Sequence, residues 1–195
     1  MAKPNVIKKE DLITAAKECL VEKGIEKFTL RAVADVAMVT QGTIYYHFRT
    51  KEQLLLEVVK DICDGSWKEL SQINEDVISQ AIISAKSRCS HDSFFHKLFL
   101  TLVVTGFNND KIREQLGNIL MQENEALSKS ILKLWTKSPI EGVSIETWGV
   151  FLNAIVDGLA LQALVSKNCS IENTFEELEQ LIIGLDRLTN LGDGK

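Results

Sequence analysis

Apolar residues recur at helical spacing along almost the whole chain, and no run of residues suggests strands at regular spacing. In the first segment, one apolar stripe contains Leu12, Ala15, Ala16, Cys19 and Leu20. The chain has only two prolines, Pro4 and Pro139, and proline is the strongest helix breaker. The pattern therefore predicts an all-α fold of about nine helices.

Threonine residues mark the expected starts of three helical segments near the N-terminus. Thr29 precedes LRAVADVA, Thr40 precedes QGTIYYHF, and Thr50 opens a capping box of the form Thr-x-x-Gln before a fourth helix. Only the residues MVT separate LRAVADVA from QGTIYYHF. Two short helices joined by such a turn form a helix-turn-helix, whose second helix normally enters the major groove of DNA. Residues 8–68 are therefore predicted to form a DNA-binding domain.

The remaining residues, 69–195, are predicted to form a second helical domain. Pro139 separates two long periodic segments, Ser144 is a suitable N-cap for the second of them, and Asn173 resembles the start of a capping box. The predicted helical spans are 74–88, 92–106, 109–137, 144–166 and 174–190.

The segment QGTIYYHF offers polar and aromatic groups to solvent if Ile44 and Phe48, four residues apart, point inward. Glutamine pairs with adenine or phosphate, glycine lets a helix N-terminus approach phosphate, and tyrosine supplies a hydroxyl and a ring. Alternatively, the tyrosines are half-buried packing residues and His47 is an ordinary histidine. Both tyrosines of the chain fall on this segment, which favours the first interpretation. The candidate DNA-binding residues are Thr29, Arg31, Thr40, Gln41, Gly42, Thr43, Tyr45, Tyr46, His47 and Lys51.

Charge is distributed unevenly over the 195 residues, whose net charge is −5. Residues 1–52 hold nine Lys/Arg against seven Asp/Glu, a net of +2, whereas residues 53–195 hold 13 against 20, a net of −7. A mildly basic head on an acidic body suggests two tasks, but the excess is too small to establish nucleic-acid binding by itself.

Several function classes are disfavoured by what the sequence lacks. The four cysteines form no CxxC pair, which argues against a zinc cluster and for a reducing cytoplasm. The N-terminus has no signal-peptide core, and no stretch approaches the ~18 apolar residues of a membrane span. Nucleophile-elbow, HExxH, P-loop and GxGxxG motifs are missing, so we expect no enzyme, no metal, no cofactor and no membrane partner. An all-helical enzyme and a redox-responsive regulator using Cys63, Cys89 or Cys169 remain as alternatives.

The stretch from Phe28 to Leu54 resembles the N-terminal domain of the TetR/AcrR family of bacterial transcriptional regulators. The positions in register are Thr29, Ala37, Val39, Thr40, Gly42, Tyr45, Phe48, Lys51 and Leu54. The family usually has glycine where this chain has Met38, and methionine at positive φ costs about 1 kcal/mol or more. We expect the turn either to be kept with slight strain or to be re-formed with negative φ. The resemblance implies that most contacts of the candidate residues are to phosphate, with Gln41, Thr43 and Tyr46 as base-contacting candidates.

The resemblance also implies a homodimeric cytoplasmic regulator, most often a repressor, that leaves its operator DNA when a small molecule binds the second domain. Such pockets are mostly apolar with a few polar groups, so we expect a largely apolar effector. The candidate pocket residues are Phe94, Phe95, Phe99, Phe107, Trp135, Phe151 and Asn153, although ordinary core packing also explains each aromatic. His96, Asp157 and Gln162 are further polar candidates. The candidate dimer interface comprises Asp157, Leu161, Leu164, Leu178, Leu181, Ile182 and Leu185 on two C-terminal helices that are densely apolar.

Overall fold

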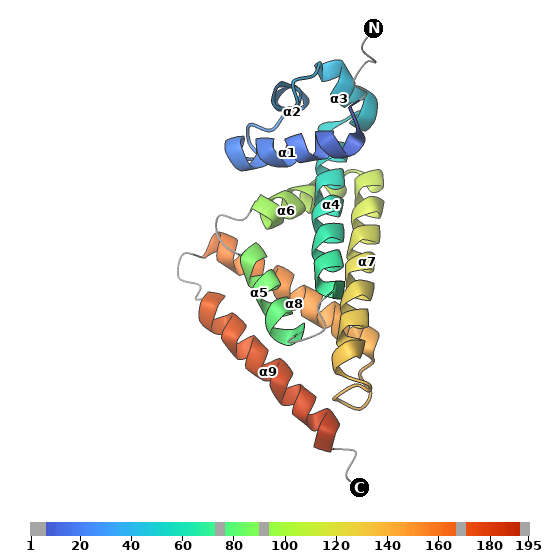
Figure 1. Cartoon of the computed structure of the whole chain (residues 1–195), viewed down its shortest axis with the longest axis vertical. Helices are drawn as coiled ribbons and strands as arrows, with labels where there is room; N and C mark the ends of the chain where they lie inside the picture. Colours follow the sequence, from blue (N-terminus) through green and yellow to red (C-terminus); the bar gives the residue numbers. More distant parts are fainter. Residues whose placement is uncertain (1–6, 73–76, 90–93, 167–170, 192–195) are drawn as a thin grey trace. The chain divides into compact units, whose positions relative to one another are not determined.

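The computed structural model is all-α (Figure 1). The structure describes residues 7–72, 77–89, 94–166 and 171–191, which contain nine helices and no strand. The helices are α1 (Lys9–Lys23), α2 (Leu30–Val36), α3 (Gln41–Phe48), α4 (Lys51–Gln72), α5 (Val77–Arg88), α6 (Phe94–Gly106), α7 (Asp110–Leu134), α8 (Ile145–Val165) and α9 (Ile171–Leu191). The all-α prediction is confirmed. The starts expected at residues 74 and 92 lie outside the described residues.

Hydroxyl side chains cap four helices where the sequence predicted them. The backbone N–H donors and their acceptors are Ala32 to Thr29 Oγ1 (3.0 Å), Thr43 to Thr40 Oγ1 (3.3 Å), Gln53 to Thr50 Oγ1 (3.1 Å) and Thr147 to Ser144 Oγ (3.2 Å). Each bond satisfies a donor that the first helical turn leaves without an intrahelical partner. The expectation for the last helix is wrong, because α9 begins at Ile171 and Asn173 lies within its first turn.

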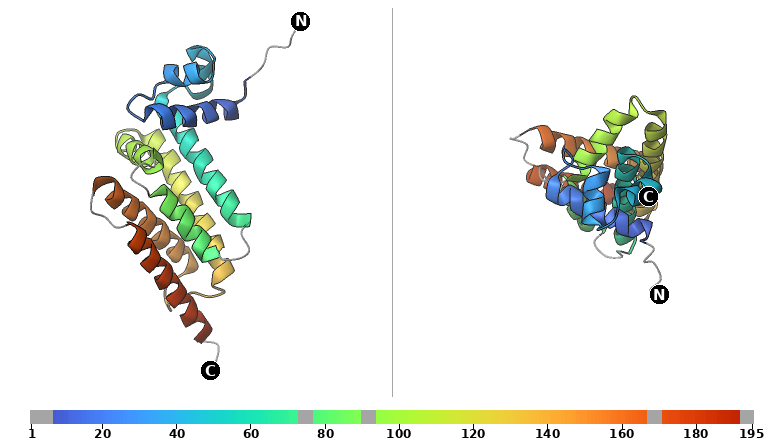
Figure 2. Two further views of the ribbon diagram at one scale, coloured as in Figure 1. Left: turned by 60° about the vertical axis from the view of Figure 1, so that its left-hand side comes forward. Right: turned by 90° about the horizontal axis from the view of Figure 1, so that it is seen from above.

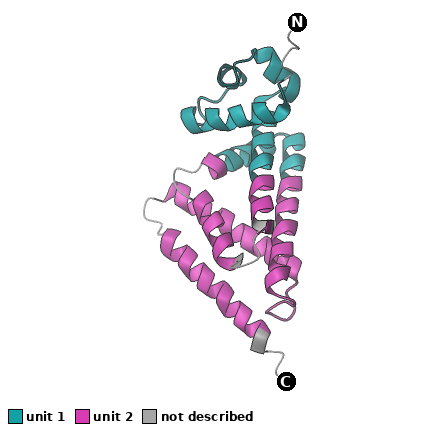
Figure 3. Ribbon diagram, viewed as in Figure 1, with its two compact units in different colours: residues 1–62, 97–116 teal, residues 63–96, 117–195 magenta. Residues whose placement is uncertain are grey.

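The chain forms two compact units, coloured teal and magenta in Figure 3. Unit 1 comprises residues 1–62 and 97–116, and unit 2 comprises residues 63–96 and 117–195. This division differs from the predicted boundary at residue 68, because most of α6 and the start of α7 pack with the N-terminal helices. Contacts between residues far apart in sequence could not be foreseen from helical periodicity, which reports only on each helix separately.

The core of unit 1 lies between α1, α2, α3 and α4. Phe28, Ile44 and Phe48 are fully buried there, together with Leu54 and Val58 of α4. The inward orientation predicted for Ile44 and Phe48 is confirmed. Because α3 has only eight residues, this burial, more than intrinsic helix propensity, holds it in place.

The core of unit 2 is formed by α5, α7, α8 and α9 around Trp135 and Phe175, which are no more than 1% exposed. Helices α7 and α8 approach each other closely at Gly149. A Cβ atom at that position would overlap Ser128 Oγ and would lie 2.7 Å from the carbonyl oxygen of Asn124. Glycine is therefore required here by space rather than by backbone conformation.

Within the described ranges, α8 is long and apolar enough, by length and composition alone, to cross a membrane. The expectation that no stretch approaches such a length is wrong for this helix. One side of α8 has partners within the chain, because Ala160 and Ala163 are buried in unit 2 and Leu152 and Val156 pack against the same core, whereas other apolar residues of the helix are exposed. A buried helix of a helical bundle satisfies the same test of length and composition.

Candidate functional site

The turn between α2 and α3 has the backbone hydrogen bonds of a Schellman motif. The N–H of Val39 donates to the carbonyl of Ala34 (3.0 Å), and the N–H of Met38 donates to that of Asp35 (3.3 Å). Met38 occupies the position at which this motif requires positive φ, and its φ is 53°. Of the two expectations for this residue, the structure shows the first: the turn is kept. Met38, whose side chain is 91% exposed, therefore has a strained backbone conformation that glycine at this position would adopt without strain.

Helix α3 presents a continuous polar and aromatic face to solvent. Tyr46 is 71% exposed and Tyr45 is 53% exposed, so neither is a packing residue. Gln41 is exposed at the N-terminal end, and Thr43 and His47 are half-buried. With Ile44 and Phe48 held in the core, these side chains share the face that the sequence predicted.

Three of the predicted contact residues also have structural tasks. Thr29 and Thr40 use their hydroxyl groups as N-caps. Lys51 Nζ donates to the carbonyl of Ile25 (3.4 Å) and lies 5.8 Å from the centroid of the Phe28 ring. Lys51 therefore fixes the loop before α2, which the sequence did not reveal.

Arg49 was missed as a site residue and lies beside the tyrosines. Its guanidinium carbon is 5.5 Å from the ring centroid of Tyr45 and 5.9 Å from that of Tyr46. It is exposed and caps α3 with a φ of 64°. A cation three residues after the exposed tyrosine pair was the available signal, since Arg stacks on aromatic rings and binds phosphate.

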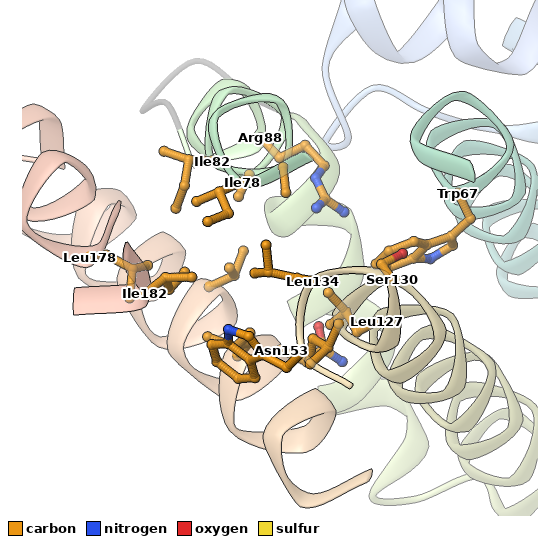
Figure 4. A pocket seen from close by; sticks show the side chains of 16 residues that line it. Trp67, Ile78, Ile82, Arg88, Leu127, Ser130, Leu134, Asn153, Leu178 and Ile182 are labelled. Atoms are coloured by element: carbon orange, nitrogen blue, oxygen red, sulfur yellow. The ribbon is translucent and has the colours of Figure 1, made fainter. Parts of the chain in front are cut away.

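Unit 2 contains a cavity between five helices, shown in Figure 4. Its volume is about 100 Å³. The lining residues are Trp67 of α4; Ile78, Ala81, Ile82, Ala85 and Arg88 of α5; Leu127, Ser130, Ile131 and Leu134 of α7, with Trp135 just after it; Leu152, Asn153 and Val156 of α8; and Leu178 and Ile182 of α9. The lining is almost entirely apolar, as in most small-molecule sites.

Trp135 and Asn153 line this cavity, as expected, but the predicted phenylalanines do not. Phe107 and Phe151 are 70% and 48% exposed, so they face solvent in the single chain. Phe99 and Phe107 belong to unit 1. Phe95 is buried against Arg88 and His96, and the half-buried Phe94 is absent from the lining. Phenylalanine residues that cluster in the sequence are thus either packed elsewhere or exposed, and they do not share this cavity.

Three N–H groups in the cavity lining are buried without a hydrogen-bond partner among the described residues: Trp67 Nε1, Trp135 Nε1 and Arg88 Nε. Arg88 reaches from α5 into the space enclosed by the lining side chains (Figure 4). Sequence reasoning missed it, although it continues the helical stripe of Ile78, Ile82 and Ala85.

The acidic groups near Arg88 already have partners. Glu123 is 6% exposed, burial raises the pKa of its carboxyl group, and the Cys63 thiol hydrogen-bonds to it. Asp157 Oδ1 lies 3.4 Å from His96 Nε2, and His96 Nδ1 is 2.9 Å from the carbonyl of Arg88. The predicted polar candidates His96 and Asp157 therefore pair with each other rather than line the cavity, and Gln162 is exposed.

Comparison with known proteins places these features in one family. Residues 12–58 match the family model described as bacterial regulatory proteins, tetR family. The N-terminal domain of the chain is therefore of the TetR type. A curated relative, the HTH-type transcriptional repressor KstR2 of Mycolicibacterium smegmatis, is 31% identical over 72 residues, which is 37% of this chain and 35% of that protein. The chain thus spans about a third of this relative's length.

Solved structures resemble nearly the whole chain. A transcriptional regulator of Rhodococcus sp. Rha1 has a TM-score of 0.64 and 23% identity, covering 90% of this chain and 94% of that one. The multidrug binding protein EbrR, solved in complex with proflavin, has a TM-score of 0.59 and 19% identity, covering 90% and 98%. At these identities, the likeness shows the fold alone, and it extends through unit 2.

The leucine and isoleucine residues predicted for a TetR-type dimer interface divide into three groups by burial. Leu178 and Ile182 are buried in the protomer and line the cavity, so these two predictions are corrected: their stripe of α9 faces inward. Leu164 and Leu185 are half-buried, and Leu185 packs against the same core. The predicted residues Leu161 and Leu181 are exposed and belong to an exposed apolar strip on the two helices, which comprises Phe151, Ile155, Leu161 and Val165 of α8 with Leu181 and Leu188 of α9.

Proposed function

We propose that this TetR-family chain is a ligand-responsive repressor that binds double-stranded operator DNA as a homodimer. The observation that carries the proposal is the α3 face, where Gln41, Tyr45 and Tyr46 are exposed on a helix held by a buried core. Exposed aromatic residues on such a short helix are unfavourable in water unless they meet a partner. The match of residues 12–58 to the tetR family supports DNA as that partner.

The chemistry of the α3 face fits phosphate contacts around a small base-reading patch. Arg49 and the tyrosine hydroxyls are suited to phosphate, and the N-terminal end of α3 at Gly42 allows close backbone approach. Gln41, Thr43 and Tyr46 are the candidates for base contact. Lys51, because it is engaged with Ile25, acts mainly by holding the fold around α3.

The unit 2 cavity is the proposed effector site, and α4 is the proposed link to DNA binding. Helix α4 starts at Lys51, directly after the α3 segment, and its Trp67 lines the cavity. The cavity volume of about 100 Å³ lies well below the roughly 300–1,000 Å³ of ordinary ligand pockets. A larger effector must therefore spread the lining helices, and displacement of α4 would move α3. Coupling of this kind is typically about 1–3 kcal/mol.

The exposed strip on α8 and α9 is the proposed dimer surface. Val165 and Leu181 are 75% and 56% exposed, which is costly for a single chain. A twofold dimer would bury this strip and present two α3 helices to two half-sites. We further propose that the protein acts in the cytoplasm, where bacterial DNA lies.

The alternative functions find less support. A redox sensor needs a thiol with a lowered pKa, but burial raises the pKa of Cys63 and Cys19 and raises that of Cys89 to about 11. Cys169 lies outside the described residues. An enzyme is disfavoured because the chain's relatives are transcriptional regulators.

Gel-shift titration with DNA from upstream of the protein's own gene tests the proposal. Tyr46→Ala should weaken binding by about tenfold or more, because each protomer loses a direct contact. Phe107→Ala is the matched control, since it removes an aromatic residue of unit 1 that is 70% exposed but lies outside α3. Equal affinity of wild type and Tyr46→Ala, with unchanged melting, would refute the assignment of α3.

A further inference from the structure

Unit 2 contains an unusual imbalance of hydrogen-bonding groups around its cavity. Three buried lining groups, Arg88 Nε, Trp67 Nε1 and Trp135 Nε1, are donors without a partner among the described residues. In contrast, the indole N–H of Trp148, outside the lining, donates to Ser138 Oγ at 3.0 Å. Buried donors in folded proteins are nearly always paired, so three unpaired donors in one cavity lining call for acceptors.

Arg88 makes the imbalance one of charge as well as of hydrogen bonds. A guanidinium group stays protonated in proteins, and burying even part of it, such as the Nε of the half-buried Arg88, is costly without a counter-charge. No ion pair within 4.0 Å is found for Arg88 among the described residues. The Arg88 guanidinium acts on Glu123 at longer range and lowers the pKa of its carboxyl group, but Glu123 is hydrogen-bonded by Cys63, and Asp157 lies beside His96. Burial has the larger effect and raises the pKa of the Glu123 carboxyl group, which weakens it as a counter-ion.

The apolar lining indicates the chemistry of the part of the ligand that does not contact Arg88. Ile78, Ile82 and Leu134 line the same cavity as Arg88 (Figure 4). Among the other polar lining groups, Ser130 Oγ already donates to the carbonyl of Ala126, and Asn153 Nδ2 donates to Asn124 Oδ1. Among the described residues, the lining therefore offers a single cation, that of Arg88, in largely apolar surroundings.

We propose that the effector is an apolar carboxylate whose anionic group pairs with the Arg88 guanidinium while its hydrocarbon body fills the unit 2 cavity. A carboxylate matches the planar fork of a guanidinium with two parallel hydrogen bonds, and its oxygens accept without donating. Cationic compounds are excluded by the same charge, and neutral ones leave Arg88 uncompensated. The inference rests on the proposed function only for the consequence of binding, which is release of DNA.

Two sets of matched probes test the charge preference. One set is phenylacetate, phenylacetamide and 2-phenylethylamine, and the other is octanoate, octanamide and octylamine. Binding to the full-length protein is followed by calorimetry and by tryptophan fluorescence, because Trp67 and Trp135 line the cavity. In at least one set, the carboxylate should bind about 10–100-fold more tightly than the amide, as expected for hydrogen bonds to a charged group, and the amine should not bind.

Arg88→Met keeps an unbranched, though shorter, side chain and removes the charge. It should abolish the preference, so that carboxylate and amide bind equally. Lys129→Met is the matched control, because it removes a cation of unit 2 whose side chain is 78% exposed. The proposal is overturned if wild type binds the amide or amine as tightly as the carboxylate, if Arg88→Met retains the preference, or if no carboxylate binds at millimolar concentration.

Gel shifts with the same probes separate this inference from the proposed function. Carboxylate binding that depends on Arg88 but leaves DNA affinity unchanged would support the anion site and contradict ligand-controlled repression. Release of DNA by the neutral amides alone would support ligand control and overturn the anion site.

Discussion

Replacing Met38 with glycine should stabilise the protein, because Met38 holds a φ of 53° in the Schellman turn between α2 and α3. A residue with a Cβ atom pays roughly 1–2 kcal/mol in this left-handed region. Glycine avoids that cost, but the greater conformational freedom of its unfolded chain lowers the free energy of unfolding by about 0.4–1 kcal/mol. The methionine side chain is 91% exposed, so little packing is lost. The expected net gain is about 0.5–1 kcal/mol, or a rise of roughly 1–4 °C in Tm for a chain of this length.

Thermal unfolding of the wild type, Met38→Gly and Met38→Ala distinguishes strain from side-chain effects. Alanine removes the exposed side chain but keeps Cβ, so Met38→Ala should stay within about 0.5 kcal/mol of wild type. The reasoning fails if Met38→Gly lowers Tm, or if Met38→Ala raises Tm as much as glycine does. DNA affinity should change little, because the turn already has the backbone conformation that glycine favours.

Three further outcomes are expected. Gly149→Ala should lower the free energy of unfolding in urea by about 1–3 kcal/mol, because the added Cβ would overlap Ser128. Gly117→Ala should be neutral or stabilising, because an added Cβ there meets no neighbouring atom within 4 Å. Equal effects of the two substitutions would contradict the close packing of α7 on α8. Glu123→Gln should raise Tm by an increment that grows from pH 5 to pH 8. Burial raises the pKa of Glu123 in the folded state, so the stability of the wild type falls as pH rises from the unfolded pKa of about 4.3 through the folded pKa. An increment in Tm that does not change with pH would count against this reasoning. DNA affinity should depend on salt more weakly than in a strongly basic binder, since residues 1–52 carry a net charge of only +2, and a log–log slope near −10 would be inconsistent with so few phosphate contacts.

The helices and the α3 face could be predicted from sequence because both depend on local signals. Thr29, Thr40 and Ser144 cap helices at the positions that their hydroxyl groups predicted as helix starts. The spacing of Ile44 and Phe48 predicted which side of α3 is buried. Capping and helical periodicity act over three or four residues, so one sequence suffices to detect them.

The cavity could not be predicted in the same way, because it depends on how five helices pack. Phe107 and Phe151 are as aromatic as Trp135, yet only Trp135 lines the cavity. Leu178 and Leu181 are neighbours on α9, but one is buried and the other is exposed. Composition indicates that a helix is apolar, whereas its partners decide which stripe becomes core, cavity or interface.

Footprinting of the DNA upstream of the gene by the full-length protein tests the central claim most directly. The account predicts one protected site at low protein concentration, formed by two inverted half-sites about one helical turn apart, as a twofold pair of α3 helices requires. The same protein with Tyr46→Ala should leave that site unprotected while melting normally. Uniform protection without a preferred site, or a site that survives Tyr46→Ala, would contradict the assignment of α3 as the DNA-reading helix.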